Sequence, residues 1–203
     1  MNLPLKTPGP ATLLQMRGAS IAPARLSDAA LVVIDAQAEY RDGRVPLDGI
    51  DAALAHIAAL LARARAGGMP VIHVRQLGQS GSLFDGAGGA FLAQAAPQGA
   101  ELVIAKRLPN AFAGTELHEV LQKVGRRNLL LAGFMTHMCV SASARAGLDL
   151  GYAVTVAADC TATRALPATD GGAPLAADQV QRVALAELAD RFAAILDSTA
   201  LAD

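Results

Sequence analysis

Three side chains capable of nucleophilic and acid–base chemistry each follow a short apolar run of the sequence. They are Asp35, Lys106 and Cys139. A cysteine attacks as its thiolate, yet a free thiol, with a pKa of about 8.5, is mostly protonated at neutral pH. A carboxylate can accept the thiol proton and later give it to a leaving amine. A nearby ammonium favours the thiolate and limits the repulsion between two adjacent anions. The three residue types together predict nucleophilic hydrolysis.

These side chains can meet only if the apolar runs before them are strands of one sheet. Continuous apolar runs predict strands that are covered on both faces, and apolar residues at helical spacing predict helices between them. The expected strands are 30–36, 70–75, 101–107, 128–134, 153–158 and 193–197, and the expected helices are 50–66, 115–124, 137–150 and 178–192. The alternation predicts a single-domain, Rossmann-like α/β fold with three α/β/α layers and a mostly parallel six-stranded sheet in the order 3-2-1-4-5-6.

This strand order brings the three candidate residues to one edge of the sheet. Ligands of open parallel sheets bind outside the carboxyl ends of the strands. The first and fourth strands are neighbours about 4.8 Å apart, so Asp35 and Cys139 can touch, and the long stem of Lys106 can span the roughly 10 Å from the third strand. Cys139 is expected in the first turn of a helix, whose N-terminus also favours the thiolate. Backbone amides of the preceding turn can hold an oxyanion.

Two segments lie outside this alternating pattern. Residues 1–28 contain several prolines and are expected to form an irregular arm, with a short apolar docking turn near residues 13–16, ahead of a hydrolase domain over 29–203. Residues 78–99 are rich in glycine and have little periodicity, which indicates a mobile excursion with one short helix.

The composition restricts the partners. Apolar residues make up 53% of the 203 residues, and the mean hydropathy is +0.35. This excess predicts a surface buried between subunits of a homo-oligomer. The net charge is −1 with no basic stripe, so neither nucleic acid nor an anionic membrane is an expected partner. Without a signal peptide or a bilayer-length apolar run, a cytoplasmic location and free thiols at Cys139 and Cys160 are expected.

Three motifs resemble one family of enzymes. They are Val32–Gln37 (VVIDAQ), Lys106 with the segment 110–115 (NAFAGT), and the pattern Gly-x-x-Thr-x-x-Cys-Val over 133–140. These are similar to the three signatures of isochorismatase-like cysteine hydrolases, and the likeness covers about residues 29–197. Each motif is weak evidence alone, but the three occur in order at the ends of the expected strands.

The resemblance implies roles for particular residues. The Asp–Lys–Cys triad of the family falls on Asp35, Lys106 and Cys139. The family's cis peptide before the nucleophile falls at Phe134–Met135, and the backbone amides of Met135 and Cys139 would form the oxyanion hole. The family further implies a small-molecule substrate and a homo-oligomer.

Two departures narrow the expected reaction. Nicotinamidases of this superfamily bind a metal through an Asp-x-His after the second strand, where this chain has His73 followed by Val, Arg75 and Gln. No two histidines have ligand spacing, so no catalytic metal or other cofactor is expected. Isochorismatases that cleave a vinyl ether lack the cysteine. Cys139 therefore favours cleavage of an amide, ureido or carbamoyl C–N bond through a thioester-type intermediate. The alternatives are a vinyl-ether hydrolase and a catalytically degenerate binding or scaffold subunit.

The sequence also allows other enzyme classes and other roles for single residues to be compared with this one. A nucleotide-dependent oxidoreductase would need a glycine-rich turn after the first strand, which this chain lacks, and a serine hydrolase would need a G-x-S-x-G elbow. Cys139 alone could be a buried structural thiol, and Cys160 matches no motif, so it is assigned to packing. Tyr40, Arg75 and Phe112 are candidate substrate contacts, although each could equally be an ordinary surface or core residue.

Overall fold

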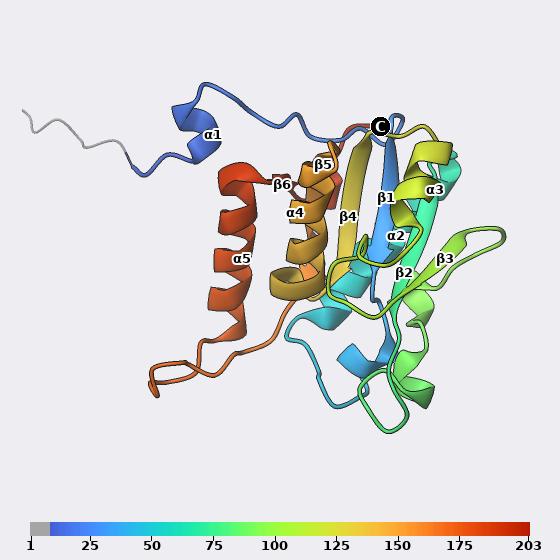
Figure 1. Ribbon diagram of the computed structural model, residues 1–203, viewed down its shortest axis with the longest axis vertical. Helices are drawn as coiled ribbons and strands as arrows, with labels where there is room; N and C mark the ends of the chain where they lie inside the picture. Colours follow the sequence, from blue (N-terminus) through green and yellow to red (C-terminus); the bar gives the residue numbers. More distant parts are fainter. Residues whose placement is uncertain (1–8) are drawn as a thin grey trace, which may run out of the picture.

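A six-stranded parallel sheet organises residues 9–203, the part of the chain that the computed structural model describes (Figure 1). The strands are β1 (Ala29–Ile34), β2 (Val71–Gln76), β3 (Leu102–Lys106), β4 (Asn128–Phe134), β5 (Ala153–Ala162) and β6 (Ala194–Leu196). They lie in the order β3-β2-β1-β4-β5-β6, and each neighbouring pair is parallel. The expected α/β class and strand order are confirmed.

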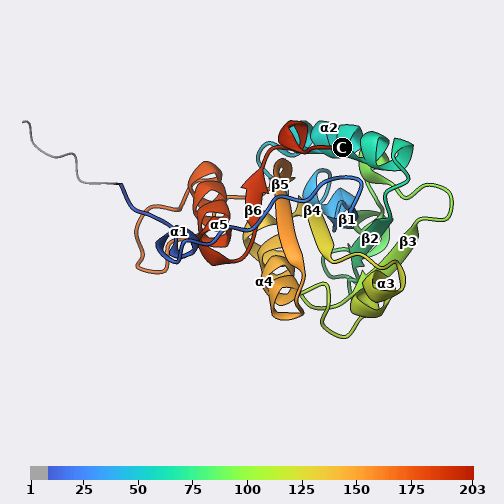
Figure 2. The ribbon, with the colours of Figure 1, turned by 90° about the horizontal axis from the view of Figure 1, so that it is seen from above.

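Helices cover both faces of this sheet. They are α1 (Leu13–Met16), α2 (Ile50–Ala66), α3 (Leu117–Lys123), α4 (Ser141–Asp149) and α5 (Ala177–Arg191). Seen from above, α2 lies on one side of the sheet, α3 and α4 lie on the other, and α5 lies beyond β6 (Figure 2). No helix within residues 9–203 is both long and apolar enough to cross a membrane.

The central strands explain why the core has two halves. All six residues of β1 are buried, and successive side chains point to opposite faces. Leu31 and Val33 join the core under α2, while Val32 and Ile34 join the core that packs against α3 and α4. The rigid centre of the sheet therefore holds the carboxyl ends of β1 and β4 side by side.

Two elements differ from the expected pattern. β5 continues to Ala162, so Cys160 lies inside the strand rather than after it. In the sequence, the polar residue Asp159 ends the apolar run. In the fold, its carboxylate accepts hydrogen bonds from Ser198 N at 2.8 Å and Ser198 Oγ at 2.7 Å, so the strand can continue past it. The segment after β4 begins with a π-helical turn, Thr136–Val140, before α4 starts.

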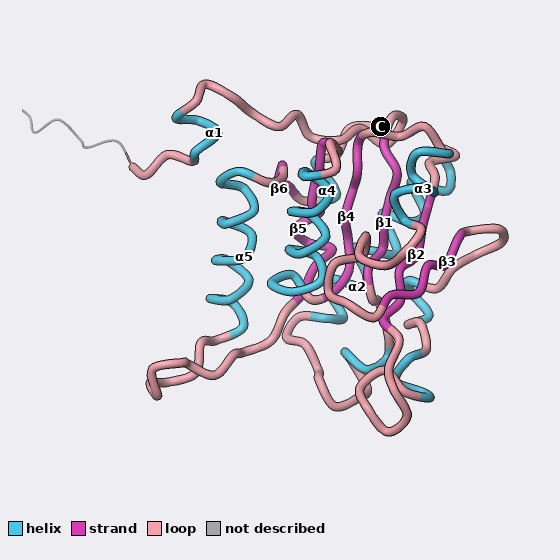
Figure 3. Tube along the Cα trace, viewed as in Figure 1, coloured by secondary structure: helices cyan, strands magenta, loops and turns pink. Residues whose placement is uncertain are grey.

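Long loops gather at the carboxyl ends of the strands, in the lower part of Figure 3. Residues 78–99, called the roof loop below, contain two 3-10 helices, Gly86–Gly89 and Ala93–Ala95, where one short helix was expected. At the other end of the sheet, the described part of the arm reaches α5, where Leu13 N donates to Asp190 Oδ1 at 2.8 Å. Residues 1–8 of the expected arm lie outside the described residues.

Candidate active site

Asp35, Lys106 and Cys139 meet at the carboxyl edge of the sheet. The Lys106 ammonium lies 2.7 Å from Asp35 Oδ2 and donates to Cys139 Sγ at 3.3 Å. The side chains of Asp35 and Lys106 are 0% exposed, and Cys139 is 4% exposed. Asp35 follows the central strand β1, and Lys106 ends β3. The strand β2 lies between these two, and the lysine stem spans it. The structure thus brings together the three residues that the sequence singled out.

Local backbone geometry fixes where Asp35 points. Its φ is +50°, in the left-handed region that a non-glycine residue rarely adopts but that Asp tolerates better than most. Its backbone amide donates to Val74 O at 2.8 Å. Next to it, Gly133 has φ +109°, and a Cβ there would collide with the carbonyl oxygen of Ile34. A glycine at 133 therefore lets β4 approach the end of β1 closely.

Two glutamines that the sequence analysis missed support Lys106. The ammonium donates to Gln76 Oε1 at 2.7 Å, and Gln76 N donates to Gln37 Oε1 at 2.8 Å. Gln37 is fully buried and donates from Nε2 to Gln76 O and to Gly89 O, at 3.1 and 3.0 Å. Gln76 pairs directly with Lys106 in the β2–β3 register. The sequence signal that could have identified Gln76 is that a polar residue ends the second strand.

Burial governs the ionisation of the site. Burial raises the pKa of the Asp35 carboxyl above its ordinary value, and the Lys106 ammonium opposes that rise. Burial and then the Asp35 carboxylate raise the pKa of the Cys139 thiol to about 12, with Lys106 again opposing. The sequence predicted a resting thiolate, whereas this environment favours the protonated thiol of Cys139. Cys139 is a buried residue of the π-helical turn, and the effect of its burial on the pKa outweighs that of the Lys106 ammonium.

The geometry suits proton transfer from Cys139 to Asp35. The Asp35 carboxylate is close enough to the thiol to raise the pKa of the thiol. Neither oxygen of this carboxylate accepts a hydrogen bond of ordinary geometry within residues 9–203. Oδ2 is held by Lys106 as an ion pair, so Oδ1 stays open to a proton. Asp35 can thus act as a base at the moment when the sulfur attacks.

The segment before Cys139 has the geometry expected of an anion-holding turn. The peptide bond Phe134–Met135 is cis, as the family resemblance implies. Met135 O accepts from Met138 N at 3.1 Å and from Val140 N at 3.2 Å, whereas Met135 N has no backbone acceptor in the described chain. Thr136 Oγ1 donates to Ala162 O at 3.1 Å and fastens the turn to β5. An amide free of internal hydrogen bonds is what an oxyanion donor requires.

Tyr40 borders the site. Its ring is buried and packs edge-on against Phe84 and Phe134, with centroids 5.2 and 6.1 Å away. Burial raises the pKa of its hydroxyl, and the charges of Cys139 and Asp35 add to that rise. The predicted substrate contact at Tyr40 therefore lies within electrostatic range of the triad.

The other two predicted substrate contacts have structural partners. Arg75 donates from Nη2 to Gly89 O at 3.3 Å, and its guanidinium lies over the Phe91 ring, 5.9 Å from the centroid. Arg75 thus fastens the roof loop. Phe112 stacks on Tyr152, with centroids 5.9 Å apart, and Tyr152 immediately precedes β5 at the amino edge of the sheet. Phe112 therefore packs in the helix layer, and its contact with a substrate stays a prediction.

A cation close to the site was also missed. Arg164 lies two residues beyond the end of β5, and its charge lowers the pKa of Tyr40 against the effect of burial. Burial first and Arg164 second lower the pKa of His137, whose Nδ1 is hydrogen-bonded to Thr163 Oγ1. Arg164 Nε and His137 Nε2 are buried without a hydrogen-bond partner in residues 9–203.

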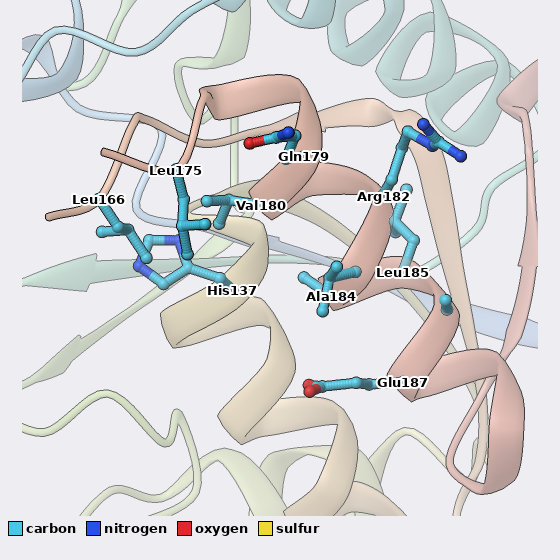
Figure 4. Close-up of a pocket in the computed structure, with 11 residues that line it drawn as sticks. His137, Leu166, Leu175, Gln179, Val180, Arg182, Ala184, Leu185 and Glu187 are labelled. Carbon is cyan, nitrogen blue, oxygen red and sulfur yellow. The ribbon is translucent and has the colours of Figure 1, made fainter. Parts of the chain in front are cut away.

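A groove along α5 does not contain the triad. It has a volume of about 940 Å³ and runs along α5, with apolar walls that include Leu166, Leu175, Val180 and Val183. Figure 4 shows His137 beside Leu166 and Leu175 at its end. Its walls lack a nucleophile and a buried carboxylate, so we assign the chemistry to the triad and regard the groove as an apolar surface feature.

Comparisons with known proteins agree with this geometry. Residues 29–200 match the model of the isochorismatase domain family. A secreted isochorismatase effector of Verticillium dahliae is 38% identical over 90% of this chain and 95% of its own. A maleamate amidohydrolase of Pseudomonas putida is 31% identical over 66% of this chain and 72% of its own. The crystal structure of an isochorismatase from Pseudomonas putida superimposes with a TM-score of 0.91 at 44% identity, covering 95% of this chain and 100% of that one. The chain belongs to the isochorismatase family, and it is a hydrolase.

Proposed function

We propose that this hydrolase is a metal-independent cysteine enzyme that cleaves a C–N bond of amide, ureido or carbamoyl type in a small molecule. The observation that supports this most strongly is the buried ammonium of Lys106, which contacts both Asp35 and Cys139. His73, in the segment where a metal-binding relative would place its ligands, is instead hydrogen-bonded to Glu101 at 2.9 Å.

The geometry supports a two-step reaction. Asp35 accepts the thiol proton as Cys139 attacks the carbonyl carbon, and the amides of Met135 and Cys139 stabilise the oxyanion. The protonated Asp35 then gives its proton to the leaving nitrogen, which departs as an amine and leaves a thioester on Cys139. Water then attacks the thioester while Asp35 takes its proton, the C–S bond breaks, and the acid product leaves as Asp35 returns that proton to the sulfur of Cys139. Lys106 stays charged and keeps the carboxylate oriented throughout.

We further propose that the substrate carries a carboxylate. Within residues 9–203, Arg164 has no carboxylate partner, and its Nη1 donates to Ala165 O at 3.0 Å. Its charge lies within electrostatic range of Tyr40 and His137. An anionic group of the substrate could pair with this guanidinium while the C–N bond lies over Cys139. The relative named for maleamate, an amide that bears a carboxylate, is in keeping with this proposal.

A panel of small amides and ureido compounds, in matched pairs with and without a carboxylate, tests the function through ammonia release. We expect release from the carboxylate-bearing members, none with Cys139→Ala, and near wild-type release with Cys160→Ala as the matched cysteine control. Release that survives Cys139→Ala would contradict the cysteine mechanism. Absence of release from the whole panel, with cleavage of isochorismate instead, would favour the vinyl-ether reaction.

We also propose a homo-oligomer. Leu175 and Val183 are 48% and 58% exposed along the apolar groove of α5. Burial of such a surface against another subunit removes apolar area from water. Light scattering that shows only a 20.7 kDa species would contradict this proposal.

A further inference from the structure

One buried carboxylate fastens the roof loop to the segment after β1. Glu39 is 4% exposed. Its Oε1 accepts from Arg44 N at 2.8 Å, and its Oε2 accepts from Phe84 N at 3.1 Å. The two oxygens therefore join two loops that are distant in sequence, on the same edge of the sheet as Asp35. No step of the proposed reaction uses this carboxylate.

The surroundings of Glu39 are closely fitted. A Cβ added to Gly88 would collide with Glu39 Oε2, and one added to Gly43 would lie 2.6 Å from Glu39 Cα. Phe84 has φ +65°, a left-handed conformation that a bulky side chain rarely adopts without support. The hydrogen bond from Phe84 N to Glu39 supplies that support.

Aromatic contacts continue from this turn to the site. The Phe84 ring meets the Tyr40 ring edge-on at an interplanar angle of 78°, and Tyr40 meets Phe134 in the same way at 80°. Phe134 directly precedes Met135, whose amide is the proposed oxyanion donor. The orientation of Tyr40 therefore depends on a ring whose backbone is held by Glu39.

We propose that Glu39 is a positioning residue, which holds Phe84 in its left-handed turn so that the Phe84 ring closes the roof loop over Tyr40 and the triad. The kinetic part of this inference, a change in KM, rests on the proposed function. The structural part, the closure of the roof loop over Cys139, can be measured without turnover.

The decisive variant is Glu39→Gln, which keeps the shape but has one acceptor oxygen in place of two. A matched control is Asp85→Asn, because Asp85 Oδ2 accepts a local hydrogen bond, from Gly81 N at 2.7 Å within the roof loop. With Glu39→Gln we expect KM to rise about tenfold, the loss expected for one charged hydrogen bond, with a much smaller change in kcat. The control should stay near wild type.

Alkylation of Cys139 by iodoacetamide, followed by peptide mapping, separates this inference from the proposed function. We expect several-fold faster alkylation in Glu39→Gln than in wild type or Asp85→Asn, whether or not a substrate is known. Phe84→Leu keeps the Glu39 hydrogen bond but removes the ring, and it should show the same increase. If Glu39→Gln does not fold, Phe84→Leu decides alone. Wild-type alkylation rates and KM in the folded variants would overturn the inference.

Discussion

Two ion clusters, one buried and one partly buried, lie at opposite edges of the sheet, and carboxylates paired with cations behave differently in them. At the carboxyl edge, Asp35 is paired with Lys106 and lies beside Cys139. At the amino edge, Glu101 accepts from Arg65 Nε and Nη2 at 2.7 and 2.9 Å. It also accepts from Gln98 N at 2.9 Å and contacts His73 Nε2 at the same distance.

The pKa values of the two carboxyls shift in opposite directions. The hydrogen bonds from Arg65 hold the pKa of Glu101 at about 2, against the effect of burial. Burial dominates at Asp35 and raises the pKa of its carboxyl. An arginine fork satisfies both carboxylate oxygens, whereas a lysine is a point charge that leaves one oxygen open. The amino-edge cluster therefore stabilises the fold, and the carboxyl-edge cluster retains a base that can still take a proton.

The same isosteric change in the two clusters should separate activity from structure. Asp35→Asn removes the proposed base, so we expect kcat to fall by about 10² to 10⁴-fold, the range for general acid–base catalysis. Glu101→Gln should leave kcat almost unchanged. Ammonia release at saturating substrate measures both. Equal losses in the two variants would mean that the clusters do not differ in function.

Removal of the Lys106 charge should change the pH profile. Because burial raises the pKa of Asp35 above 3.8, we expect the acid limb of kcat/KM to lie above that pH, where the carboxylate is lost as pH falls. Lys106 lowers this pKa, so Lys106→Met should move the limb to still higher pH and abolish most activity at neutral pH. An acid limb of kcat/KM at the same pH in Lys106→Met as in wild type would show that this limb does not report the ionisation of Asp35.

Removal of the glutamine that supports Lys106 should have a smaller effect. Gln76→Met deletes an acceptor for the ammonium but leaves its ion pair with Asp35. We expect kcat/KM to fall about tenfold, the loss of one hydrogen bond to a charged group. Leu77→Met, at the next position, serves as a control for the substitution. An unchanged kcat/KM in Gln76→Met would show that the ion pair alone orients Lys106.

The smallest effect concerns stability at the amino edge. The pKa of Glu101 falls from an ordinary 4.5 in the unfolded chain to about 2 in the fold, so its stabilisation is present above pH 4.5 and is lost as pH falls towards 2. Glu101→Gln should lower Tm by a few degrees at pH 7. The difference in Tm from wild type should shrink below pH 4.5. Calorimetry across this range would refute the assignment if the difference stayed constant.

The sequence predicted the strand order and the triad because both depend on local signals. The run before Asp35 is apolar at every position since β1 is buried on both faces, and Lys106 and Cys139 follow equally clear runs. Parallel strands then bring these residues to one edge whatever the details of the loops.

Other features depend on contacts that no local pattern records. The support from Gln76 requires the β2–β3 register, and the packing of Phe112 on Tyr152 requires the position of the β3–α3 connection relative to the turn between α4 and β5. The protonated state of Cys139 follows from its depth beneath the neighbouring loops, which periodicity does not predict. Glu39 was not singled out because a glutamate after a strand normally faces solvent.

The coupling between Asp35 and Cys139 is tested most directly by the pH dependence of Cys139 alkylation in wild type and Asp35→Asn. Burial and the Asp35 carboxylate raise the pKa of this thiol to about 12, so at neutral pH the sulfur needs a base that takes its proton as it attacks. We predict that iodoacetamide modifies Cys139 more slowly in Asp35→Asn than in wild type at neutral pH, and that the rate in the variant rises steeply with pH as the thiol ionises. Alkylation of Asp35→Asn at the wild-type rate or faster at neutral pH would contradict a proton passed from sulfur to this carboxylate.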